Sequence, residues 1–149
     1  MLNDIYNRQI LAFAADIPRL GRLSEPGGTA VAHSRLCGSK VTVDVTLDGD
    51  RVADFAHEVK ACALGQASSS IMARHVVGST VGELRALKAQ MHAMLKQGGD
   101  PPSGKWAELE ALTPVRDFKA RHASTLLTFD ATVEAAERAL AGRDAGASA

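Results

Sequence analysis

Strict alternation of apolar and polar side chains constrains the fold of this chain more than any other feature. Apolar Val41, Val43, Val45 and Leu47 alternate with polar Thr42, Asp44, Thr46 and Asp48. A period of two predicts a strand with one buried and one solvated face, because successive strand side chains point to opposite faces. The Asp48-Gly49 pair is typical of a tight turn, and residues 52–59 resume the strand pattern with Phe55 inward. We therefore predict an antiparallel meander of about three strands over residues 29–59.

The segments on either side of this meander have a helical pattern. Apolar residues in 2–17 share a helical face that begins near Asn3 or Asp4 and ends before Pro18. Residues 19–28 are rich in glycine and predict an irregular crossing. After the sheet, helices are expected at residues 67–77, from the Thr80 and Glu83 capping box onward, at 106–112 before Pro114, and at 120–140. The order predicts an α+β fold: an N-terminal helix, a three-stranded antiparallel sheet, then helices packed on one side.

Size and charge narrow the classes of function. With 149 residues, we expect one domain over residues 1–141 and a flexible Ala/Gly-rich tail at 142–149. Lys and Arg number 17, as do Asp and Glu, and they are interspersed, which argues against nucleic-acid binding. No apolar run is long enough to span a bilayer, and the first residues lack the pattern of a secretory signal. We therefore expect a cytoplasmic protein that binds no membrane.

The two cysteines are the first candidates for chemistry. Cys62 follows the last predicted strand and precedes small residues that enter a helix, where unpaired backbone N–H groups stabilise an anion such as a thiolate. Cys37 lies between the first two strands, next to Gly38. Antiparallel pairing would bring both to one end of the sheet. In a reducing compartment they are expected to be thiols or soft metal ligands rather than a disulfide. A buried apolar role for Cys62 stays open.

The histidines add little to a metal site. A closed zinc site needs about four ligands, and the cysteine spacing matches no short zinc motif. His75 and His92 fall at helical positions typical of solvated or core-edge histidines, and His57 is expected to point off the sheet. His122, at the start of the last helix, would lie near the cysteines if that helix packs close to the strand ends.

Several motifs carry a resemblance to a known family. Cys37-Gly38 resembles a first ligand loop, Cys62 with the run Ala67-Ser68-Ser69-Ser70 and Met72 resembles a second ligand and its Ala/Ser-rich helix, and residues 77–83 resemble the turn and helix that follow. Residues 94–118 are similar to the insertion of one branch. The chain resembles the IscU/NifU-type iron–sulfur cluster scaffold family, SufU-like branch, from Ile5 to about Ala136.

The resemblance implies a ligand set that is incomplete in this chain. It makes Cys37 and Cys62 the cluster-binding and metal-binding residues. Ser124 falls at the position of the family's third cysteine, and Ser39 at that of the aspartate after the first Cys-Gly. His122 lies one residue before the position where many members have histidine, so it is a weak ligand candidate.

The family further implies binding of a [2Fe–2S] cluster, iron or zinc, with a cysteine desulfurase as partner and apo iron–sulfur proteins as recipients. The leading hypothesis is a scaffold-like, non-enzymatic assembly protein that binds iron, zinc or a cluster through two cysteines. The alternatives are a metal-free persulfide acceptor or desulfurase activator, and a regulatory paralogue that binds no metal.

Overall fold

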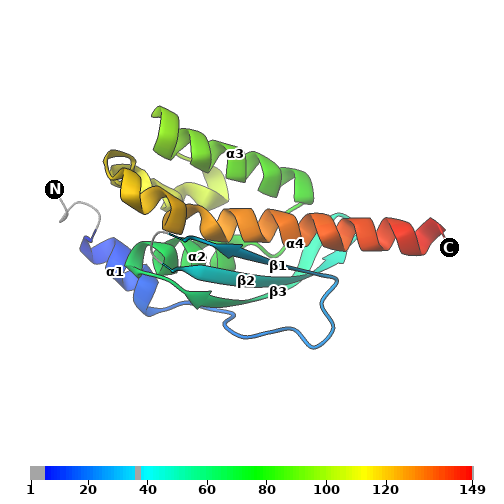
Figure 1. Cartoon of the computed structure of the whole chain (residues 1–149). Coiled ribbons are helices and arrows are strands. Elements are labelled where there is room, and N and C mark those ends of the chain that lie inside the picture. Colours follow the sequence, from blue (N-terminus) through cyan, green and yellow to red (C-terminus); the bar gives the residue numbers. More distant parts are fainter. Residues whose placement is uncertain (1–5, 36–37, 149) are drawn as a thin grey trace.

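The computed structural model describes residues 6–35 and 38–148, with side chains described up to residue 142. The elements along the chain are α1 (Arg8–Ala15), β1 (Gly28–His33), β2 (Lys40–Asp48), β3 (Arg51–Lys60), α2 (Ala63–His75), α3 (Val81–Gln97), the 3₁₀ helices η2 (Gly104–Asp117) and η3 (Lys119–Arg121), and α4 (His122–Ser148). The helices lie on one side of the sheet (Figure 1). The predicted α+β fold is confirmed.

The sheet has the order β1-β2-β3, with both pairs antiparallel. Its inner face is apolar: Val41, Val43 and Val45 are fully buried. The long helix α4 crosses this face over β1 and β2. The contact is close enough to require glycine at the start of β1, since a Cβ on Gly28 would lie 2.1 Å from the carbonyl oxygen of Ala135. The alternating pattern thus places the sheet directly against the C-terminal helix.

The outer face of the sheet is only partly solvated. The prediction that its side chains are solvated is wrong for Thr42 and Asp44, which are both buried. In the irregular crossing predicted over residues 19–28, residues 19–21 pair with the edge of β3, where Gly21 N–H donates to the His57 carbonyl at 2.8 Å, and residues 22 and 23 then reach this face. Asp44 there accepts hydrogen bonds from Arg22 Nε (2.7 Å), the Leu23 backbone N–H (3.0 Å) and Thr29 Oγ1 (2.6 Å). Burial alone would raise the pKa of Asp44, but these hydrogen bonds hold it below its ordinary value.

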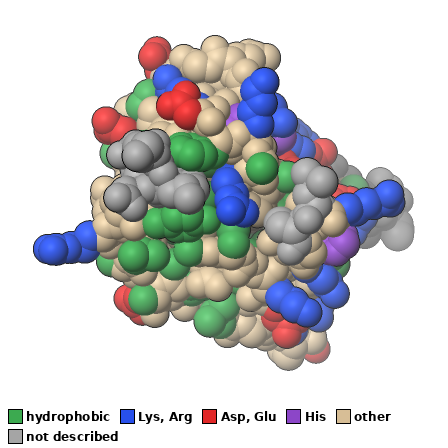
Figure 2. All heavy atoms as spheres, turned by 60° about the vertical axis from the view of Figure 1, so that its left-hand side comes forward, with side chains coloured by type: hydrophobic (Ala, Val, Ile, Leu, Met, Phe, Trp, Pro, Cys, Tyr) green, Lys and Arg blue, Asp and Glu red, His purple; other side chains and the backbone are tan. Residues whose placement is uncertain are grey.

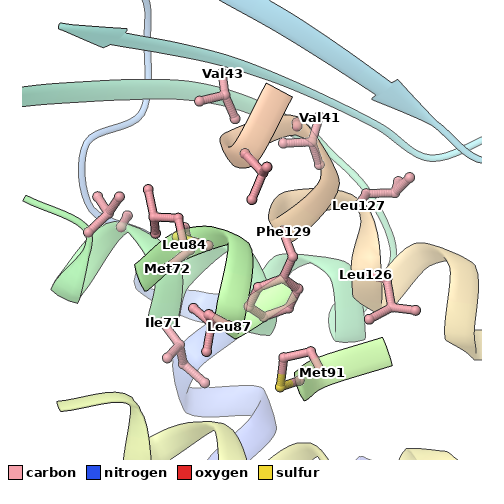
Figure 3. Packing of buried hydrophobic residues seen from close by; sticks show 14 of the residues in the cluster. Val41, Val43, Ile71, Met72, Leu84, Leu87, Met91, Leu126, Leu127 and Phe129 are labelled. Carbon is pink, nitrogen blue, oxygen red and sulfur yellow. The ribbon is translucent and has the colours of Figure 1, made fainter. Parts of the chain in front are cut away.

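The core lies between the sheet and the helices. Phe129 of α4 points toward Leu87 and Met91 of α3, while Ile71 and Met72 of α2 pack beside them (Figure 3). All five side chains are at most 4% exposed. The apolar cluster therefore holds α2, which follows the sheet, and α4, which crosses it, in fixed positions relative to each other.

His57 belongs to this buried interior, contrary to the expectation that it points off the sheet. It pairs with Val43 and therefore shares the inner face, where it is fully buried. Its Nε2 donates to the Pro18 carbonyl at 2.9 Å, and its Nδ1 has no hydrogen-bond partner among the described residues. Burial lowers the pKa of the imidazole, because a buried site disfavours the charged form.

Several predicted helix limits were wrong. The first helix begins after its N-cap Asn7 rather than near Asn3 or Asp4, which lie outside the described residues. The helix α2 starts at Ala63 rather than at residue 67, and α4 continues to Ser148. The flexibility of residues 142–149 stays a prediction. Pro114 does not stop η2, which buries Trp106, Leu109, Leu112 and Val115. That interval of three matches the 3.0 residues per turn of a 3₁₀ helix.

Within the described residues, no helix combines the length and apolarity that crossing a bilayer requires.

Candidate thiol site

Cys62, predicted to lie at a helix entrance, is the N-cap residue of α2, which begins four residues earlier than expected. Its backbone is extended (φ −69°, ψ 175°), and its carbonyl accepts the first helical hydrogen bond, from Gln66 N–H at 2.9 Å. The side chain makes no capping bond and is half-buried. Its sulfur therefore lies beside the positive end of the α2 dipole without being used to cap that helix.

Ser124, from the first turn of α4, is the side chain that meets this sulfur. The Cys62 Sγ and Ser124 Oγ atoms are 3.4 Å apart, within hydrogen-bond range for sulfur, and Ser124 is 2% exposed. The serine hydroxyl also lies 3.3 Å from the Arg121 carbonyl, to which it donates. A neutral thiol can then donate to Ser124, whereas a thiolate would accept if the hydroxyl turns toward it. The two residues, 62 positions apart in the chain, thus form one site.

Gly65 permits this approach between α2 and α4. A Cβ at that position would lie 2.6 Å from the Cβ of Ala61 and 3.1 Å from the carbonyl oxygen of Ser124. The neighbouring serines are used for packing and backbone contacts: Ser68 donates to the Gly65 carbonyl at 3.2 Å and Ser70 to the Asp16 carbonyl at 2.9 Å. The small residues after Cys62 therefore set the helix spacing at the site.

Gly38 and Ser39, in the segment between β1 and β2, lie beside Cys62. The ends of this segment are joined by hydrogen bonds from Ser34 N–H to the Ser39 carbonyl (2.8 Å) and from Gly38 N–H to the Ser34 carbonyl (2.9 Å). Gly38 adopts φ +70°, which glycine tolerates best. A hollow of about 190 Å³ is lined by Gly38, Ser39, Lys60, Ala61 and Cys62. Cys37 lies outside the described residues, but the residues that directly follow it border the same hollow as Cys62.

The hydrogen bonds of His122 restrict its use as a metal ligand. It is 6% exposed, and its Nε2 lies 3.1 Å from the Val115 carbonyl and 3.0 Å from the Arg116 carbonyl. Because carbonyls only accept, Nε2 carries the proton and cannot ligate a metal in this arrangement, which leaves Nδ1. Among the described residues, no group of three or more His, Cys, Asp or Glu side chains is placed to hold a metal ion.

The end of the molecule that carries this site is turned forward in Figure 2. Apolar side chains gather on this face, with Lys and Arg side chains beside them and the acidic ones mostly toward the margin of the view.

Comparison with known proteins identifies the family. The chain matches the NifU-like N terminal domain over residues 5–124, a range that includes the helix cap Cys62 and ends at Ser124. The chain belongs to this family. The match confirms the resemblance seen in the two cysteine motifs, and it covers every element from α1 to the first turn of α4.

Relatives within the family bear names that concern iron–sulfur clusters. The chain is 33% identical over 103 residues to "Iron-sulfur cluster assembly scaffold protein IscU" of Streptococcus pyogenes, a match covering 68% of this chain and 64% of that protein. It is 27% identical over 95 residues to "Zinc-dependent sulfurtransferase SufU" of Bacillus subtilis, covering 64% and 65%. The chain thus spans less than two thirds of the length of either relative. The predicted scaffold class agrees with the first name.

Solved structures share the fold over nearly the whole chain. The N-terminal part of a "Nitrogen-fixing NifU-like protein" from Brucella abortus superposes with a TM-score of 0.91 at 55% identity, covering 93% of this chain and 96% of that one. A SufU protein from Fervidobacterium islandicum gives a TM-score of 0.82 at 22% identity, covering 90% and 98%, which supports the fold alone.

Proposed function

We propose that this protein takes part in iron–sulfur cluster assembly and holds its cargo, iron, zinc or a [2Fe–2S] cluster, through Cys37 and Cys62. The observation that carries the proposal is the hollow shared by Cys62 and the end of the loop that bears Cys37. Thiolates are the ligands that soft metals and iron–sulfur clusters prefer. A cytoplasmic location is part of this proposal.

The donor set suits cargo held briefly rather than a permanent centre. Two thiolates fall short of the about four ligands of a closed site. Ser124 Oγ is a hard donor that replaces a thiolate poorly, and the Nε2 of His122 is committed to backbone carbonyls. Open positions on the cargo would then be filled by groups from outside this chain, and transfer to an apo iron–sulfur protein would break few bonds.

Zinc titration against a chromogenic chelator tests this site. We expect the wild type to compete for zinc, and both Cys37→Ala and Cys62→Ala to lose competition. Ser124→Ala should remain close to wild type, because the hydroxyl contributes little as a ligand. Equal competition by the wild type and Cys62→Ala would contradict the assignment.

A second candidate function, sulfur acceptance, is favoured by the contact between Cys62 Sγ and Ser124 Oγ. The Cys62 thiolate would attack the outer sulfur of a persulfide on a donor such as a cysteine desulfurase. A new S–S bond forms on Cys62, the S–S bond of the donor breaks, and the electron pair leaves with the donor thiolate. The serine hydroxyl can donate to the attacking thiolate and then to the sulfur it has gained.

Mass spectrometry separates this candidate from the first. After incubation with a desulfurase and cysteine, one added sulfur on the Cys62 peptide is expected, and Cys62→Ala should gain none there. An unchanged mass of the Cys62 peptide would contradict sulfur acceptance.

A further inference from the structure

Three basic residues form a row across the end of the sheet next to the thiol site. The strand register pairs His33 with Lys40 and Lys40 with Lys60. Directly paired residues share a face of the sheet, here the outer face, opposite to α4. All three side chains are exposed. We call His33, Lys40 and Lys60 the basic row; its last member is two residues before Cys62 and lines the hollow beside it.

The charges of Lys40 and Lys60 are not neutralised within the described part of the chain. Neither lysine makes an ion pair there, whereas Lys88 on α3 pairs with Asp130 at 3.8 Å. The nearest acidic residue along β3 is Glu58, which lies 3.9 Å from Arg22. Like charges directly opposite each other on neighbouring strands destabilise a sheet. In a chain with 17 Lys and Arg and 17 Asp and Glu residues, the two facing lysines are a local excess of positive charge.

We propose that the basic row docks an extended acidic segment of a partner protein and brings that partner beside Cys62. Neighbouring strands are about 4.8 Å apart, so the row extends over roughly 10 Å. That span matches about three residues of an extended chain and exceeds the reach of one small carboxylate. A second hollow, of about 170 Å³, lies along the row between Lys40, Thr42, Glu58, Val59 and Lys60. Charge complementarity therefore favours an acidic peptide that lies across the strands.

The biological role of this docking rests on the proposed function, because a partner at Cys62 would deliver sulfur or receive cargo there. The docking itself needs neither metal nor sulfur chemistry. Charge complementarity of this kind mainly raises the association rate and selects the partner.

The probe is a fluorescein-labelled octaglutamate peptide, mixed at low salt with the full chain carrying Cys37→Ala, which leaves Cys62 as its only cysteine. Peptide affinity is measured by anisotropy, and the rate of Cys62 alkylation by iodoacetamide is measured with and without peptide. We expect binding that weakens with salt and slows alkylation. Adding Lys40→Glu with Lys60→Glu should weaken binding about tenfold or more, because two attractions become repulsions. Lys96→Glu, an exposed reversal on α3, should change affinity less than about twofold per charge reversed.

Four results would overturn the proposal. These are no binding to the parent, equal loss of affinity in Lys96→Glu and in Lys60→Glu alone, binding that leaves alkylation of Cys62 unchanged, and protection by acetate as effective as that by peptide at equal carboxylate concentration. The last would assign the row to small anions. Since the mixture holds no metal or sulfur donor, failure here is distinguishable from failure of the zinc and persulfide experiments.

Discussion

Gly65→Ala tests whether the thiol site depends on the close packing of α2 against α4. Alanine favours a helix over glycine by about 1 kcal/mol. Against this gain, the new methyl group would lie 2.6 Å from the Cβ of Ala61 and 3.1 Å from the Ser124 carbonyl oxygen. Both atoms belong to or are fixed by backbone, so one helix must shift, and overpacking of this kind costs about 1–3 kcal/mol. The cost less the gain is a net loss of up to about 2 kcal/mol in the free energy of unfolding.

Gly82→Ala provides the matched control, because it is also helical and its Cβ would meet only Thr80 Oγ1, at 3.8 Å. That variant should gain about 0.5–1 kcal/mol from helix propensity alone. Urea unfolding followed by circular dichroism measures the free energy of unfolding of both variants. In thermal unfolding, a change of about 1 kcal/mol should shift Tm by about 2–4 °C. Gly65→Ala should also change the alkylation rate of Cys62, whereas Gly82→Ala should not. If the two alanine variants were equally stabilised, the reasoning about this interface would be refuted.

Three further predictions concern buried or substituted polar groups. Asp44→Asn should lower the free energy of unfolding by about 2–4 kcal/mol. Because the native pKa of Asp44 is lowered, its stabilising contribution is present above its unfolded pKa and is lost as pH falls through the native pKa. The wild type should therefore lose more stability than the variant between about pH 5 and about pH 2. His57 is buried with a lowered pKa, so the unfolded state binds the proton more readily, and urea unfolding should show stability falling as pH drops below about 6.5, a dependence that His57→Phe should reduce. Ser124→Cys should raise zinc affinity at least about tenfold in chelator competition by placing a third thiolate beside Cys62; unchanged affinity would show that position 124 does not face the cargo.

The parts of the fold that follow from local patterns were predictable. The alternation at Val41, Val43 and Val45 identified β2, and the Thr80 and Glu83 pair identified the start of α3, where Thr80 Oγ1 accepts from Glu83 N–H at 3.0 Å. Cys62 could be placed at a helix entrance because small residues follow a strand pattern. These features depend on residues near one another in the chain.

The parts that depend on long-range contacts were not predictable in the same way. Asp44 had the pattern of a solvated strand position, but its buried carboxylate accepts hydrogen bonds from Arg22 and the Leu23 backbone, which lie 22 and 21 residues earlier in the chain. Alternation from Phe55 does place His57 inward, so that signal was available and was outweighed by the polarity of the side chain. The interval of three from Trp106 to Val115 could likewise have identified η2.

In the candidate site, too, some residues were identified by local motifs and others depend on long-range contacts. Cys62 and the substituted position Ser124 were recognised by motif, and the structure places their side chains in contact. The roles of Gly65 and Lys60 depend on helix spacing and strand register, which no local motif contains.

Anaerobic reconstitution with iron and sulfide tests the central claim most directly. Iron and acid-labile sulfide are measured on the wild type, Cys37→Ala and Cys62→Ala after removal of unbound reagents. The account predicts that the wild type retains both and that each variant loses them. Equal retention by the wild type and the two variants, or absence of iron and sulfide from a wild type that also fails to compete for zinc, would contradict the claim that the two cysteines hold the cargo.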